Sequence, residues 1–136
     1  MLAEIVVFFY LPLLFRHHAL STILMVSAAL GVIRFQMLGW AADWLALLLA
    51  AQVLHAATFG SYHAAAVAAV HRVFAPGGRA RGQTLFSSLG YGAGAAAGTV
   101  AAGWAWQFGP GIAFTVSSLA ALAGLLFAYP LKRAGL

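Results

Sequence analysis

The sequence predicts an all-α integral membrane protein with five transmembrane helices. Of its 136 residues, 64% are hydrophobic and only 7% are charged, whereas a soluble domain carries about 25% charged residues. Apolar segments of the length of a membrane span follow one another, separated by short connections. Positive charge is confined almost entirely to alternate connections, which is typical of a chain that crosses a bilayer repeatedly.

The spans follow from the length of each apolar segment. A helix needs about 20 apolar residues to cross about 30 Å of hydrocarbon. The runs are too long for strands and lack a two-residue alternation, and a helix satisfies its backbone hydrogen bonds internally. We place the five spans at about residues 1–15, 19–38, 44–71, 83–107 and 111–131.

The basic residues predict the orientation of these spans. Six of the seven Lys and Arg residues lie after the first span, after the third span or in the C-terminal tail: Arg16, Arg72, Arg79, Arg81, Lys132 and Arg133. The positive-inside rule assigns these connections to the cytoplasm. We therefore expect a multi-pass protein of the cell (inner) membrane, with the N-terminus outside and the C-terminus cytoplasmic.

The number of spans is odd, and the first span has only about 15 residues before Arg16. That is short for a complete crossing, so we expect a longer protein from which N-terminal helices are missing. The alternative is a genuine small protein of five helices.

Glycine recurs every fourth residue in the fourth span, at Gly90, Gly94 and Gly98. Small residues with this spacing line one helix face and let another helix approach closely in lipid. We predict a packing surface here. A helix that also slides or rocks during transport is the alternative use of the same face.

Three ionisable residues fall inside the spans: Glu4, Arg34 and His55. At 1.5 Å per residue they lie about 18, 22 and 24 Å from the basic ends of their helices, and therefore in one layer. Ionisable groups at membrane depth usually face a bundle interior or an aqueous cavity and mark a functional site.

The common depth predicts a Glu4–Arg34 ion pair with His55 nearby. Pairing offsets the cost of placing each charge in the membrane. Histidine and carboxylate side chains can also exchange protons, so protonation and substrate binding could act on the same network. The alternative is a static ion pair that holds helices together, with Arg34 extending to the interface.

The third span carries a polar and aromatic stripe. At 100° per residue, Gln52, His55, Phe59 and Tyr62 share one face, which is typical of a cavity lining. His63 lies about 80° from His55 around the helix, which disfavours a bis-histidine metal or haem site. We expect His63 to pack or to form a hydrogen bond.

The sequence shows no motif for catalysis, for metal or phosphate binding, or for nucleic-acid binding. The chain has no cysteine, which excludes disulfides and thiolate metal sites. The stretch "APGGRARG" lacks the lysine and the strand–loop–helix context of a phosphate-binding loop. We find no nucleophile–base pair, and the basic residues suit membrane topology rather than nucleic acid. The sequence thus predicts neither an enzyme, nor a cofactor or metal site, nor a nucleic-acid-binding protein.

The stretches "QVLHAATFGSYHAAAVAAVHR" and "RARGQTLFSSLGYGAGAAAGTVAAGWAW" resemble the C-terminal region of the major facilitator superfamily. The resemblance is strongest to the lactose-permease-like branch that includes phenylpropionic acid transporters and nucleoside–proton symporters. It covers nearly the whole chain and rests on short motifs: Leu54-His55, Thr58-Phe59, Arg81 with Gln83, the glycines from Gly90 to Gly103, Ala3-Glu4, and the Gly31 to Arg34 stretch.

The resemblance implies that the five spans correspond to helices 8–12 of a twelve-helix carrier. In proton–sugar symporters of that superfamily an acid, an arginine and a histidine on the corresponding helices form the coupling network. Glu4, Arg34 and His55 occupy comparable places here. The family's second carboxylate on the histidine helix is absent, because the third span has none after Asp43.

Our leading hypothesis is part of a secondary-active transporter, with proton-coupled symport of a small organic solute such as an aromatic acid. Its partners would be the lipid bilayer, the solute and protons, and the N-terminal helices of the same transporter. The alternative is a non-transporting membrane scaffold or subunit that pairs with another chain through the Gly90 to Gly98 face.

Overall fold

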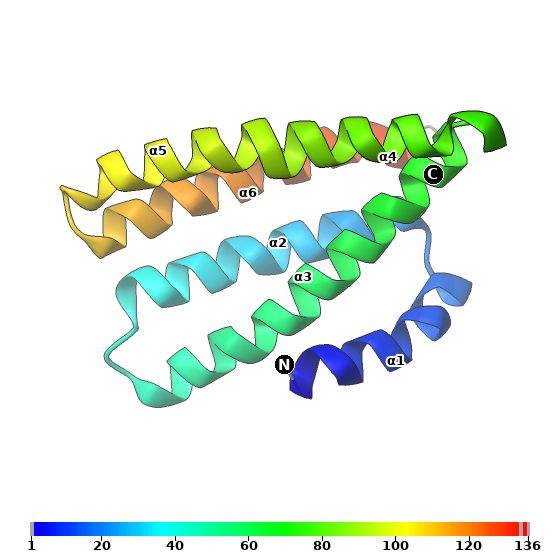
Figure 1. Cartoon of the computed structure of the whole chain (residues 1–136). Coiled ribbons are helices and arrows are strands. Elements are labelled where there is room, and N and C mark those ends of the chain that lie inside the picture. The colour runs from blue at the N-terminus through cyan, green and yellow to red at the C-terminus, as the bar shows by residue number, and fades with distance from the viewer. Residues whose placement is uncertain (1, 134, 136) are drawn as a thin grey trace.

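A computed structural model describes residues 2–133 and 135, without the side chains of residues 2–4 and 8. Every regular element among the described residues is helical. The elements are α1 (Leu2–His17), α2 (Leu20–Trp40), α3 (Leu45–Val73), the 3-10 turn η1 (Pro76–Gly78), α4 (Arg79–Ser87), the π-helical η2 (Ser88–Gly94), α5 (Ala95–Trp106) and α6 (Pro110–Arg133) (Figure 1).

Three helices of the described chain have the length and composition to cross a membrane, namely α2, α3 and α6. The first helix, α1, has 16 residues. The fourth predicted span corresponds to α4, η2 and α5, which follow one another without a break and divide into pieces of 9, 7 and 12 residues. Three predicted crossings are therefore confirmed as membrane-capable helices. The crossings by α1 and by the α4–η2–α5 rod stay predictions.

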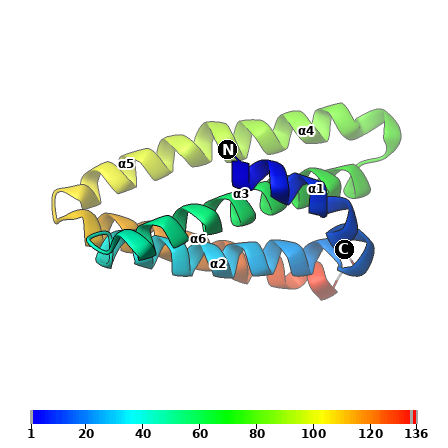
Figure 2. The ribbon, with the colours of Figure 1, turned by 90° about the horizontal axis from the view of Figure 1, so that it is seen from below.

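The connections fall at two ends of the bundle (Figures 1 and 2). The α1–α2 and α3–α4 connections and the end of α6 lie together, and these carry the six basic residues outside Arg34. The α2–α3 and α5–α6 connections lie at the opposite end. In the latter, Gly109 adopts φ 105°, and Pro110 begins α6, where its missing N–H costs nothing.

Packing is closest between α2 and its two neighbours, α6 and α3. A cluster of buried residues at the basic end joins these three helices: Leu20, Ile23, Leu24, Ala65, Ala66 and Ala128. At the other end, α2 and α6 approach so closely that a Cβ on Gly39 would lie 2.9 Å from Phe114 Cβ. Only glycine fits at such a contact.

Hydrogen bonds between side chains tie the same helices together. Trp40 Nε1 on α2 donates to Thr115 Oγ1 on α6 at 3.2 Å. On the other side of α2, the hydroxyls of Ser27 and Ser61 lie 3.0 Å apart, linking α2 to α3. The Ser27–Ser61 bond is buried between the helices, where no water competes for the hydroxyls, so it helps to join α2 and α3.

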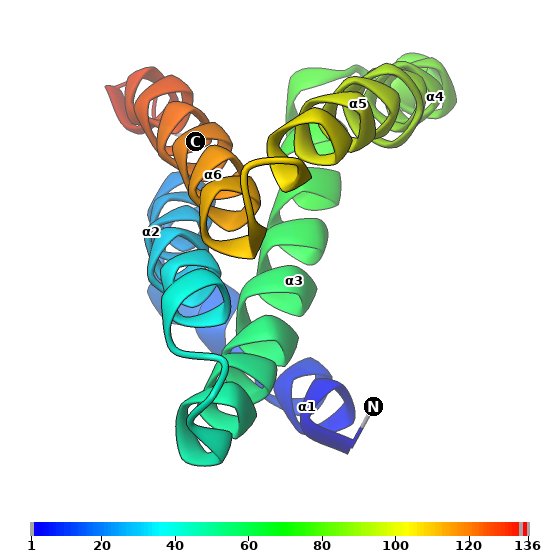
Figure 3. The same cartoon turned by 90° about the vertical axis from the view of Figure 1, so that its left-hand side faces the viewer.

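The α4–η2–α5 rod diverges from the rest of the bundle (Figure 3). It contacts α3 near the α3–α4 connection and α6 near the α5–α6 turn. Between those contacts, residues 88–101 are all exposed within this chain. The first helix, α1, packs on α3 away from α6.

Candidate functional site

A groove of about 660 Å³ runs along α2, α3 and α6, with Phe86 contributed by α4. Most of its lining is apolar. Three of the predicted site residues, Arg34, His55 and Tyr62, line it together. A mostly apolar cavity with a few convergent polar groups is the usual form of a small-molecule site.

Arg34 brings the positive charge of this groove. It projects from α2, and its guanidinium lies 4.9 Å from the ring centroid of Phe35. Its Nε is buried, and among the described residues it has no hydrogen-bond partner. A cation with an unused donor in an apolar groove is suited to bind an anionic group, because charge-assisted hydrogen bonds are the stronger ones.

Aromatic rings on α3 form a row that begins at His55. The ring centroids of His55 and Phe59 lie 5.5 Å apart, and those of Phe59 and His63 lie 6.3 Å apart with their planes within 11°. The row arises because residues four apart lie one above the other on a helix. Phe59 and His55 both line the groove, so the row forms part of its wall.

The row ends in a hydrogen bond to another helix. His63 Nδ1 and Tyr91 Oη lie 2.6 Å apart, and the imidazole tautomer decides which group donates. Tyr91 belongs to η2 and also meets Phe86 edge-on, with ring centroids 6.1 Å apart. The sequence indicated a packing or hydrogen-bonding role for His63, and the structure shows both. It did not indicate Tyr91, because the partner depends on how the fourth span packs.

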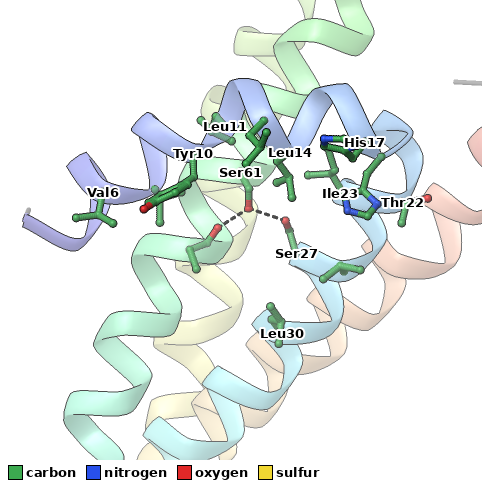
Figure 4. A pocket seen from close by; sticks show the side chains of 15 residues that line it. Val6, Tyr10, Leu11, Leu14, His17, Thr22, Ile23, Ser27, Leu30 and Ser61 are labelled. Atoms are coloured by element: carbon green, nitrogen blue, oxygen red, sulfur yellow. Dashed lines mark hydrogen bonds between the residues drawn. The ribbon is translucent and has the colours of Figure 1, made fainter.

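One predicted site residue lies outside the groove, and the side chain of another is not described by the structure. Gln52 is exposed and is not part of the groove lining. The side chain of Glu4 lies outside the described residues, so its pairing with Arg34 stays a prediction. The helix that carries it, α1, lines a second cavity of about 650 Å³ with α2 and α3, in which Ser27 and Ser61 are joined by a hydrogen bond (Figure 4).

The glycine face of the rod has no partner helix among the described residues. A Cβ added at Gly90 or Gly98 would meet nothing within 4 Å, and one at Gly94 would meet only Leu89 O of the same rod at 3.1 Å. The predicted packing through this face therefore stays a prediction for other parts of a larger assembly. Three glycines that do meet close neighbours in this chain, Gly39, Gly82 and Gly111, were not indicated by the sequence.

Comparison with known proteins assigns the chain to a family. The model of the MFS_1-like family matches residues 1–116. The "Probable 3-phenylpropionic acid transporter" of Escherichia coli (strain K12) is 35% identical over 123 residues, which cover 88% of this chain and 31% of that protein. The chain thus spans about a third of the length of this relative. No solved structure gives a significant match.

The family match confirms the resemblance seen in the sequence, and it agrees with a helical, multi-pass architecture. The family and the relative are transporters rather than enzymes. The chain therefore belongs to the MFS_1-like family of the major facilitator superfamily.

Proposed function

We propose that this chain is part of a secondary-active transporter that carries a small aromatic acid in symport with protons. The observation that carries the proposal is the groove, in which the Arg34 guanidinium lies beside Phe35 and in the same lining as Phe59. A carboxylate would pair with Arg34, and an aromatic ring would pack on the apolar and aromatic wall. The name of the relative, a probable 3-phenylpropionic acid transporter, agrees with this chemistry.

Proton coupling would reside in Glu4, Arg34 and His55. Arg34 and His55 line one groove, and Glu4 belongs to α1, which packs on α3, the helix of His55. A proton bound by Glu4 or His55 would change the charge that Arg34 meets, and hence its affinity for a carboxylate. Solute and proton would then bind with mutual dependence, which is what symport requires.

The remaining helices of the carrier would complete the site. Alone, this chain offers one wall of a cavity, whereas carriers of this fold bind their solutes between two helical halves. The uncovered rod and its glycine face support contact with further helices of the same transporter. In the proposed orientation, the basic end of the bundle faces the cytoplasm of a cell whose inner membrane holds the protein.

The test is uptake of labelled 3-phenylpropionate by cells that express the full-length transporter. We expect uptake to fall when an uncoupler collapses the proton gradient. Arg34→Ala should lower uptake on the order of tenfold or more, because a charge-assisted contact to the solute is lost. Glu4→Ala should abolish the dependence on the proton gradient.

Arg133→Ala is the matched control, since Arg133 is an exposed arginine at the end of α6 that lies over Tyr129, outside the groove. Its uptake should equal that of the wild type when the amount of protein in the membrane is equal. Full uptake by Arg34→Ala would contradict the proposed solute site. Uptake that an uncoupler leaves unchanged would contradict proton coupling.

A further inference from the structure

Tyr91 stands apart from the predicted site, yet it contacts the end of the aromatic row. We propose that Tyr91 is a positioning residue that couples the place of the α4–η2–α5 rod to the groove residue His55, through His63 and Phe59. The effect of this coupling on transport rests on the proposed function. The contact on which it depends, between His63 and Tyr91, does not involve the groove residues Arg34 or Tyr62.

The first step is that this hydrogen bond is the tie between the middle of the rod and the bundle. Residues 88–101 are exposed within the chain, and Tyr91 itself keeps 48% of its surface exposed. The rod is otherwise attached near its two ends. A tyrosine hydroxyl at membrane depth has no water as an alternative partner, so a bond of 2.6 Å to His63 Nδ1 restrains the rod.

The second step concerns the backbone around Tyr91. The rod is π-helical from Ser88 to Gly94, and this segment contains three glycines, at 90, 92 and 94. Short π segments weaken and widen a helix and are common where a helix bends or where a site is built. Tyr91 therefore anchors the rod at the segment where its backbone can adjust most easily.

The third step is the path from Tyr91 to the groove. The imidazole held by Tyr91 stacks on Phe59, and Phe59 in turn contacts the ring of His55. Since rings in a packed row cannot shift independently, a displaced His63 moves the Phe59 ring, which lies in the groove wall beside His55. The position of the rod is thus transmitted to the site by direct contact.

The first experiment measures the rod itself. The chain has no cysteine, so spin labels can be attached at Leu49→Cys on α3 and Val100→Cys on α5, both exposed, once any cysteines elsewhere in the full-length transporter are replaced. Tyr91→Phe removes only the hydroxyl, and we expect it to lengthen and broaden the distribution of label distances. Tyr129→Phe removes a hydroxyl of similar exposure on α6 and should leave the distribution unchanged. A wild-type distribution for Tyr91→Phe would overturn the proposal.

The second experiment separates the His63–Tyr91 hydrogen bond from the stacking of His63 on Phe59. His63→Asn keeps a hydrogen-bond acceptor near the place of Nδ1 but removes the ring that stacks on Phe59. We expect wild-type label distances together with a half-saturation concentration for 3-phenylpropionate uptake raised about threefold to tenfold, and an unchanged maximal rate per transporter. Since His63 does not line the groove, an unchanged half-saturation concentration would overturn the coupling to His55.

The two proposals fail in different ways. If the wild-type transporter takes up no aromatic acid, the proposed function is wrong. The label distances of Tyr91→Phe against Tyr129→Phe still decide whether Tyr91 holds the rod.

Discussion

The α2–α6 pair and the α4–η2–α5 rod both contain helix glycines, yet the pair is tightly packed around its glycines and the rod is not. In the pair, Gly39 and Gly111 lie where a Cβ would come within 3.0 Å of the facing helix. In the rod, Gly90 and Gly98 have no neighbouring atom within 4 Å of such a Cβ. Small residues permit close approach, but the difference shows that they do not cause it.

Specific contacts close the α2–α6 pair. The ring of Trp40 covers Gly111, and its Nε1 donates to Thr115 Oγ1. Ser118 Oγ adds a bond of 3.2 Å to the Val32 carbonyl across the interface. Gly39 and Gly111 thus each face an aromatic residue of the other helix, Phe114 and Trp40 respectively. Among the described residues, the rod has one hydrogen bond of this kind to another helix, between Tyr91 and His63.

The largest expected effect comes from filling the space between α2 and α6. In Gly39→Leu the new Cβ would lie 2.9 Å from Phe114 Cβ and 3.3 Å from the backbone of Gly111, and neither can yield without moving a helix. We expect the free energy of unfolding to fall by about 3 kcal/mol, at the upper end of overpacking in a core. Thermal unfolding of the purified protein in detergent measures it.

The matched control is Gly103→Leu in the rod, where an added Cβ meets nothing within 4 Å. It adds the same side chain to a helix glycine, so in this 136-residue chain it should leave the midpoint of unfolding close to that of the wild type. Equal destabilisation by both substitutions would show that the contrast between pair and rod is wrong.

Much of the fold could be predicted because it depends on local composition. Apolar length indicated α2, α3 and α6, and the basic clusters indicated which connections share one end. The π segment η2 could not be predicted, since apolar length and composition do not distinguish a π-helical turn from an α-helical one. The same holds for the divergence of the rod, which is decided by tertiary contacts that the sequence does not display.

The candidate site likewise contains residues that the sequence predicted and residues that only tertiary contacts reveal. Arg34 and His55 were indicated as ionisable residues at membrane depth and Tyr62 by the helix stripe that it shares with His55, and all three line one groove. Gln52 shares a helix stripe with His55, but it lies about one turn beyond the groove, where the helices no longer enclose it. Tyr91 was not predicted, because the sequence does not show that it pairs with His63 on another helix.

An intermediate effect is expected where the rod meets the rest of the transporter. Gly98→Leu should leave the unfolding midpoint of this chain unchanged, because nothing lies within 4 Å of the new Cβ. In the full-length transporter the same substitution should lower uptake severalfold if further helices pack on the glycine face. Unchanged uptake, with normal amounts of protein in the membrane, would mean that this face meets lipid. The glycine face would then be no argument for a packed partner helix.

The smallest effect should come from the polar tie between α2 and α3. Ser27→Ala removes the hydroxyl that lies 3.0 Å from Ser61 Oγ, and it leaves Ser61 bonded to the Ala57 carbonyl of its own helix. Because Ser61 keeps this partner, the free energy of unfolding should fall by only about 0.6 kcal/mol, the average for such bonds between membrane helices. Ser117→Ala is the control, because the Ser117 hydroxyl bonds within α6, to the Ala113 carbonyl at 3.2 Å. This substitution should lower the free energy of unfolding by less than Ser27→Ala does. A loss above that of Gly39→Leu would mean that hydrogen bonds rather than close packing hold α2 in place.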